Sequence, residues 1–202
     1  VFYEPSGLAD TTRVFALGSG SASHGAFLGA LVTFYLGTRT SPEGPWAHLD
    51  LAMSGAVALI PLWRLGNLLN SEIVGTRWDG PWAFVFVRHD CFDVARDACT
   101  APPRHPTVLY EALLGAGLVA LAAWLQHVWR PRLRPGVIFA ILLSATFAGR
   151  MLVELTRERE DVDAGWPVTM GFLLSVPFAF AGAGLLIAWR GRLRIDTSAA
   201  SQ

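Results

Sequence analysis

Arg64-Leu65-Gly66-Asn67-Leu68-Leu69-Asn70-Ser71-Glu72 closes an apolar run that begins at Leu51. The run predicts a membrane-spanning helix, and its last turns place polar and charged side chains at about one-turn spacing. Such groups are costly in hydrocarbon and need partners, so by default they indicate a functional site. Arg64 alone would be explained as a side chain that reaches the interface at a helix end. Followed by Asn67, Asn70 and Glu72, it is interpreted as part of a site.

The composition is that of an integral membrane protein. The 202 residues are 52% hydrophobic and only 16% charged, whereas about a quarter of the residues of a soluble domain are charged. Stretches without Asp, Glu, Lys or Arg run over 14–38, 51–63, 112–129, 135–149 and 164–189. Because a span needs about 20 mostly apolar residues, we expect an all-α membrane protein, a polytopic bundle of five transmembrane helices. The expected helices are 21–37, 47–70, 107–129, 136–156 and 167–189.

The arginines predict how this single transmembrane domain, 1–202, is oriented. They cluster in short segments at 130–134 and 190–194, and such basic segments face the cytoplasm. The C-terminus is therefore expected in the cytoplasm, and the long loop at about 71–106 outside it. That loop holds both cysteines, Cys91 and Cys99, which predicts a disulfide in an oxidising compartment. Two unpaired thiols are the alternative. No basic stripe indicates nucleic acid.

The other polar residues singled out within the predicted helices all fall in the outer half of the bundle. Arg150, Glu154 and Arg157 share one face of the helix 136–156, and Arg150 lies about 22 Å from its cytoplasmic end at the helical rise per residue. An interfacial ladder of ion pairs is the alternative for these three.

Three further polar residues, His24, Tyr110 and Glu111, begin helices that enter from outside. His24 alone would be a satisfied helix-start histidine. Together with Arg64 and Arg150, the one-sided distribution predicts a polar cavity at the outer leaflet, where two arginines suit an anionic group such as a lipid phosphate. No Cys/His cluster suggests a metal, and neither metal nor cofactor is expected.

Four motifs together resemble those of the prolipoprotein diacylglyceryl transferases of bacterial inner membranes. They are His24-Gly25-Ala26, the stretch Arg64-Leu65-Gly66-Asn67-Leu68-Leu69-Asn70-Ser71-Glu72, the stretch Arg104-His105-Pro106-Thr107-Val108-Leu109-Tyr110-Glu111, and the stretch Arg150-Met151-Leu152-Val153-Glu154-Leu155-Thr156-Arg157. They occur in the family's order and extend over most of the chain. The family has seven spans, so the resemblance implies a multi-pass inner-membrane protein that lacks the first two.

The resemblance implies transfer of diacylglyceryl from phosphatidylglycerol, or another anionic lipid, to the lipobox cysteine of a precursor protein. The thiol attacks the head-group-side carbon of the glycerol, and glycerol phosphate leaves. His24, Arg64 and Arg150 would be catalytic, and His24 or a carboxylate would take the thiol proton. Residues expected to bind substrate are Asn67, Asn70, Glu72, Arg104, His105, Tyr110, Glu111, Glu154 and Arg157.

Departures from the family pattern leave two other classes of function open. Trp63 and Ser71 stand where the family has glycine, and Ala26, Val108, Thr146 and Phe172 also differ from it. We expected bulk at Trp63 to narrow the cavity. One alternative is a catalytically inactive relative that serves as a lipid-binding subunit of a larger membrane assembly. The other is a transporter, which is disfavoured because the polar residues stop at mid-membrane and the sequence shows no internal repeat.

Overall fold

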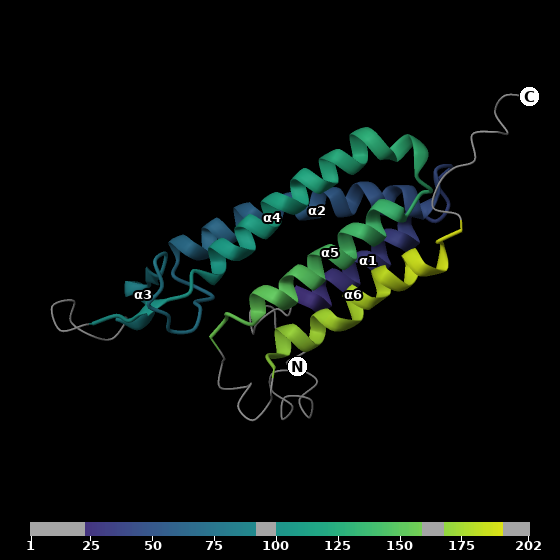
Figure 1. Cartoon of the computed structure of the whole chain (residues 1–202). Helices are drawn as coiled ribbons and strands as arrows, with labels where there is room; N and C mark the ends of the chain where they lie inside the picture. Colours follow the sequence, from purple (N-terminus) through teal and green to yellow (C-terminus); the bar gives the residue numbers. More distant parts are fainter. Residues whose placement is uncertain (1–22, 92–99, 159–167, 192–202) are drawn as a thin grey trace, which may run out of the picture.

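A computed structural model describes residues 23–91, 100–158 and 168–191 of the chain. Its long helices lie side by side in an elongated bundle (Figure 1). They are α1 (Ser23–Thr38), α2 (Gly44–Leu69), α4 (Thr107–Trp124), α5 (Val137–Glu154) and α6 (Met170–Ala188). Beyond Trp124, α4 continues as a π-helical turn, Leu125–Trp129, and a 3-10 turn, Arg130–Arg132.

Four helical segments in the described part of the chain are long and apolar enough to cross a membrane. They are Gly44–Leu69, Thr107–Arg132, Val137–Glu154 and Met170–Ala188. The protein is therefore a helical membrane protein with several spans, as its apolar runs predicted. Helix α1 is shorter than these four segments, and its apolar part covers only Ala26–Thr38. The membrane span predicted at 21–37 therefore stays a prediction.

The helices pack most closely where small residues face a neighbouring backbone. A side chain at Gly182 of α6 would come within 2.6 Å of the carbonyl oxygen of Ala140 in α5, and one at Gly115 of α4 would come within 2.9 Å of the Pro61 ring in α2. Such close approach is typical of helix contacts in membranes. It holds α5 against α6 and α2 against α4, the two most extensive helix pairs of the bundle.

A carboxylate that the sequence did not single out fixes the start of α5. Asp50 of α2 is only 4% exposed. Its two oxygens accept hydrogen bonds from the backbone N–H groups of Gly136 (2.9 Å) and Phe139 (2.7 Å). The first N–H groups of a helix have no partner within the helix, and negative charge is favourable beside them. Asp50 therefore caps α5 from a neighbouring helix.

Asp50→Ala is expected to destabilise the bundle by about 3 kcal/mol, because two buried N–H groups lose their acceptor. Asp50→Asn, which keeps one acceptor oxygen, should cost less. The measurement is the free energy of unfolding in detergent, with Asp79→Ala, at an exposed loop position, as the control. Equal stability of Asp50→Ala and the wild type would contradict the capping role.

The loop between α2 and α4 adds a small sheet at one end of the bundle. Strand β1 (Phe84–Val85) pairs antiparallel with β2 (Pro103–Arg104), and α3 (Val87–Asp90) follows β1. The backbone of Thr76 pairs on one side with Thr156 and on the other with His105, both at 2.9 Å. These pairings join the end of α5 to the start of α4.

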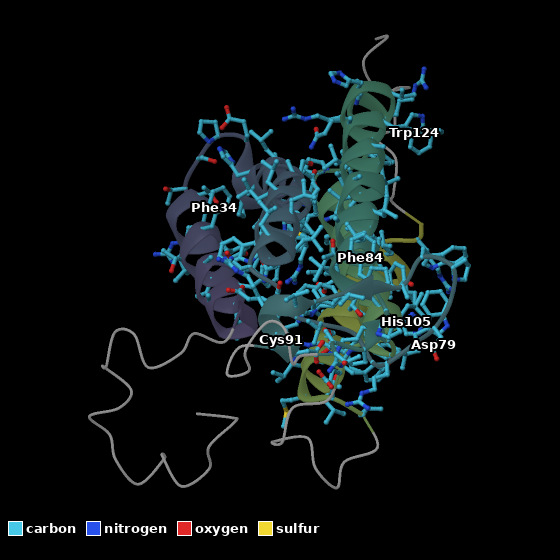
Figure 2. All side chains as sticks on the ribbon, turned by 90° about the vertical axis from the view of Figure 1, so that its left-hand side faces the viewer. Phe34, Asp79, Phe84, Cys91, His105 and Trp124 are labelled. Carbon is cyan, nitrogen blue, oxygen red and sulfur yellow. The ribbon has the colours of Figure 1, made fainter. Side chains whose placement is uncertain are left out.

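This sheet lies at the opposite end of the bundle from the turn that leads into α5 and the end of α6 (Figure 1). Figure 2 views the molecule from the sheet end and labels Asp79, Phe84, Cys91 and His105 there. The two arginine-rich segments begin at the other end. Which of the two ends faces the cytoplasm stays a prediction.

Cys91 is disulfide-bonded, and Cys99, the only other cysteine of the chain, lies outside the described residues. The Cys91–Cys99 pairing stays a prediction. Digestion of unreduced protein after thiol blocking should yield one cross-linked peptide pair containing both residues. Recovery of both peptides carrying the blocking group would show instead that the thiols are free.

Candidate functional site

Two arginines from different helices meet on one carboxylate at the sheet end of the bundle. Arg64 Nε of α2 lies 2.8 Å from Glu111 Oε2 of α4, and Arg150 Nη1 of α5 lies 3.4 Å from Glu111 Oε1. The three side chains are 13%, 17% and 7% exposed for Arg64, Arg150 and Glu111. Since each oxygen of Glu111 engages one guanidinium, this carboxylate sets the separation of the two arginines.

A second carboxylate extends the pair into a chain of alternating charges. Glu154 Oε2 lies 3.8 Å from Arg150 Nη2, and Glu154 Oε1 lies 3.4 Å from Arg157 Nη1. Thr169 also donates to Glu154 Oε1 at 3.0 Å. A side chain at Gly171 would come within 2.5 Å of that oxygen, so the glycine allows α6 to begin directly against Glu154.

Three guanidinium groups and two carboxylates make up this chain, Arg64–Glu111–Arg150–Glu154–Arg157. We call it the ion-pair chain. Buried charges of this kind persist where geometry and partners compensate their desolvation. Two guanidinium groups on one carboxylate suit an anionic ligand.

The ion-pair chain faces a cavity of about 190 Å³, which we call the arginine cavity. Its polar lining is Arg64, Glu111, Thr146 and Arg150, and its apolar lining is Phe27, Ile60, Leu114 and Phe147. Phe27 also lines a neighbouring apolar cavity between α1 and α2. That cavity shares Leu31, Leu49 and Phe139 with a larger apolar groove of about 680 Å³. A polar chamber beside an apolar groove suits an amphiphile.

Glu154 and Arg157 also line a second cavity, of about 460 Å³, together with Thr169 and Phe172. Arg150 does not line it. Arg150 and Arg157, which both lie near Glu154, therefore line different cavities. In the part of the chain that the structure describes, no group of His, Cys, Asp or Glu is arranged to hold a metal ion.

The asparagines and the glutamate that follow Arg64 lie beside the arginine cavity rather than in its lining. Asn67 is buried and donates to Glu72 Oε2 at 3.3 Å. Glu72 and Asn70 are exposed, and Asn70 caps the end of α2. The stretch 64–72 therefore folds back at the end of α2, where Asn67 contacts Glu72. Arg64, at its start, lines the arginine cavity.

Arg104 organises the loop between α2 and α4. Its buried guanidinium binds both oxygens of Asp90, at 3.0 and 2.5 Å, and Glu158 Oε1 at 2.8 Å. It also donates to the carbonyl oxygen of Gly75 at 3.2 Å. The pKa of Arg104 is raised above its usual value, chiefly by the hydrogen bond with Asp90 and also by that with Glu158. The predicted substrate contact of Arg104 is not part of this arrangement.

His105, in the same loop, and Tyr110, near the start of α4, belong to one aromatic cluster. The His105 ring stacks on Trp78 with ring centroids 4.3 Å apart and planes 7° apart, and its Nδ1 is hydrogen-bonded to the Tyr110 hydroxyl at 3.2 Å. Trp82 Nε1 donates to the same hydroxyl at 3.2 Å. Neither His105 nor Tyr110 lines the arginine cavity. No sequence pattern had indicated that Trp78 and Trp82 would join them.

The structure also shows the surroundings of Trp63 and Ser71, two residues that differ from the family pattern. Trp63 is 72% exposed and does not line the arginine cavity, so the expectation that it narrows the cavity was wrong. Ser71 has φ +56°, a left-handed conformation that glycine adopts at no steric cost, which explains a glycine at this motif position.

His24 lies in the first turn of α1, and its side chain falls outside the described residues. Its role as a base stays a prediction.

Fold and site together define a multi-pass helical membrane protein with a buried arginine pair facing a cavity beside an apolar groove. A sequence model of the family described as prolipoprotein diacylglyceryl transferase matches residues 1–188. The chain belongs to this family, as its four motifs predicted.

Curated relatives agree with the family match. They include phosphatidylglycerol–prolipoprotein diacylglyceryl transferases of Chloroherpeton thalassium (35% identical, covering 92% of this chain and 67% of the relative), Tolumonas auensis (34%, 83% and 62%) and Bordetella bronchiseptica (36%, 93% and 69%). The chain thus spans roughly two thirds of the length of these relatives.

Proposed function

We propose that this protein transfers diacylglyceryl from phosphatidylglycerol to the lipobox cysteine thiol of a prolipoprotein. The observation that carries the proposal is the convergence of Arg64 and Arg150 on Glu111 at one cavity. The relatives' names supply the lipid donor and the protein acceptor. The two guanidinium groups at this cavity support an anionic donor.

The chemistry asks for positive charge at the leaving group. The thiolate sulfur attacks the glycerol carbon that carries the phosphate, a C–S bond forms, and the C–O bond breaks with its electron pair on oxygen. Glycerol phosphate leaves with one more negative charge than the phosphodiester had. Preorganised cations at that position stabilise the transition state. In this proposal, Arg64 and Arg150 fill that role, and Glu111 holds them in place.

The thiol must lose its proton to react. His24 is the proposed acceptor, with a carboxylate of the ion-pair chain as the alternative. Of these carboxylates, only Glu111 is among the residues lining the arginine cavity. Because Glu111 already pairs with two arginines, protonating it would weaken both pairs, and this favours His24.

The lipid's amphiphilic shape also supports the proposal. With the phosphate between Arg64 and Arg150, the acyl chains would follow the apolar lining past Phe27 into the groove between α1, α2, α5 and α6. In the membrane, we propose that α1 is the fifth span, that the loop at about 71–106 lies outside the cytoplasm, and that the C-terminus lies inside it. The bacterial inner membrane is the proposed location.

The test is an activity assay of the protein in phosphatidylglycerol-containing membranes with a lipobox peptide as acceptor. A mass increase of the peptide by one diacylglyceryl group, dependent on the lipobox cysteine, is expected. Replacing phosphatidylglycerol with phosphatidylcholine should abolish the product. Binding of phosphatidylglycerol without any transfer would instead identify an inactive lipid-binding relative.

A further inference from the structure

We propose that Thr169 is a positioning residue, whose hydroxyl holds the Glu154 carboxylate in the orientation that keeps Arg150 directed at the lipid phosphate. This inference rests on the proposed function and deepens it. Thr169 directly precedes α6, and none of the four motifs includes it. It lines the second cavity and not the arginine cavity. It therefore acts through Glu154 and does not touch the lipid phosphate.

The Thr169 hydroxyl joins the first turn of α6 to the end of α5. Its oxygen accepts a hydrogen bond from the backbone N–H of Phe172 at 3.2 Å, and it donates to Glu154 Oε1 at 3.0 Å. An ionised carboxylate only accepts and a hydroxyl has a single proton, so the direction of both bonds is fixed. With φ −69° and ψ 155°, Thr169 has the extended backbone of an N-cap. The hydroxyl is therefore held in place by α6.

Glu154 makes a closer contact with Thr169 than with either arginine of its ion pairs. Its oxygens lie 3.8 Å from Arg150 Nη2 and 3.4 Å from Arg157 Nη1, against 3.0 Å from the Thr169 hydroxyl. Hydrogen bonds from nitrogen to oxygen typically measure about 2.7–3.2 Å, so these two arginines leave the direction of the carboxylate loosely fixed. Of the three contacts, the one with the hydroxyl orients it best.

The first turn of α6 also favours a negative charge at this place. Glu154 is the last residue of α5, where the C-terminal end of the helix dipole disfavours a carboxylate. Its side chain lies instead against the N-terminus of α6, since a side chain at Gly171 would come within 2.5 Å of Glu154 Oε1. Both Glu154 and Thr169 are buried, and burial strengthens a hydrogen bond to a charged group.

Arg150 depends on Glu154 for one of its two ion pairs. Its Nη1 pairs with Glu111 and its Nη2 with Glu154, so the guanidinium is oriented from two sides. If the Glu154 carboxylate can turn, one of these two constraints is lost. A cation stabilises developing charge most when it is already oriented before the reaction. The Thr169 hydroxyl therefore contributes to the transfer step at a distance.

Three substitutions at Thr169 separate the hydrogen-bond donor from the helix cap. Thr169→Ser keeps both, Thr169→Gly caps a helix about as well as threonine but has no donor, and Thr169→Val lacks both. Each is made in the full chain and assayed in phosphatidylglycerol-containing micelles with a lipobox peptide. We expect kcat to fall by about tenfold for Thr169→Gly and Thr169→Val, because Arg150 is less well oriented. It should stay within about threefold of wild type for Thr169→Ser.

Thr107→Val is the matched control. It removes another buried threonine hydroxyl at the sheet end of the bundle, one that is hydrogen-bonded to Thr156 and not to the ion-pair chain. Thermal unfolding should show a similar loss for Thr107→Val and Thr169→Val, whereas kcat should fall only for the latter. Wild-type kcat in Thr169→Gly would overturn the inference, because the cap alone would then suffice. Equal losses of kcat in Thr169→Ser or Thr107→Val would overturn it as well, because packing would then be responsible.

A second measurement separates this inference from the proposed function. The NMR signal of the Arg150 Nε–H group in arginine-labelled protein, assigned by its loss in Arg150→Lys, reports the surroundings of the guanidinium without any transfer. Thr169→Gly should shift or broaden this signal, and Thr169→Ser should leave it in place. If this pattern holds and the wild type transfers no lipid, the transferase proposal fails while the positioning of Arg150 stands. An unchanged signal in Thr169→Gly would overturn the inference and leave the transferase proposal intact.

Discussion

Arg64→Lys is expected to lower diacylglyceryl transfer by about 10²–10³-fold, the usual effect of removing a preorganised donor at a developing charge. Arg64 Nε is held by Glu111 at 2.8 Å, so the guanidinium has a fixed orientation at the cavity. A lysine ammonium is a point charge without the planar fork, and it cannot bind Glu111 and a phosphate with the same geometry. Arg64→Ala and Arg150→Ala should be at least as impaired.

The measurement is kcat and KM for phosphatidylglycerol with a lipobox peptide. A fall mainly in kcat is expected, because the leaving phosphate gains charge only in the transition state. Arg39→Lys, on an exposed arginine outside the site, is the matched control and should leave both constants unchanged. If Arg64→Lys retained wild-type kcat, the arginine pair would not be acting on the leaving group.

The second large effect is expected at Glu111. Glu111→Gln removes the charge that both Arg64 and Arg150 face, at 2.8 and 3.4 Å. Leaving buried partners without their counter-charge costs about 3–5 kcal/mol, so we expect a marked fall in stability. Activity should fall as strongly as for Arg64→Lys, because the two guanidinium groups lose the carboxylate that sets their separation.

Glu43→Gln is the control for Glu111→Gln. Glu43 is exposed and directly precedes α2, outside the candidate site. Thermal unfolding and transfer should both stay near wild type. Anionic lipid should raise the unfolding temperature of the wild type more than that of Glu111→Gln. Equal activity of Glu111→Gln and wild type would contradict the role of this carboxylate in orienting the arginines.

The depth of each polar residue along its helix could be predicted from the sequence. This prediction identified Arg64 and Arg150 as a pair. The apolar runs predicted helices that match α2, α4, α5 and α6 closely. Arg64 and Arg150 were expected at one depth because their distances from the helix ends follow from the constant rise per residue. The structure brings the two together on Glu111.

Orientation around each helix axis was much harder to predict. Helices that are apolar on most sides give no clear face, so the sequence did not show that Trp63 points away from the cavity. It also did not show that Asp50 would reach the N-terminus of α5. Both depend on how α2 is rotated against its neighbours, which is decided by packing.

The sequence by itself determined that this is a multi-pass membrane protein with an arginine pair at one end, because hydrophobic runs and buried charge are local properties. It also determined the family, because four motifs preserve order and chemistry across the chain. Only the tertiary structure decided how the charges are paired. Glu111 bridges two arginines, Glu154 pairs with two arginines that line different cavities, and Arg104 joins parts of the loop between α2 and α4. Those roles arise between residues far apart in the chain, and they depend on distances of a few ångströms that only the packed helices set.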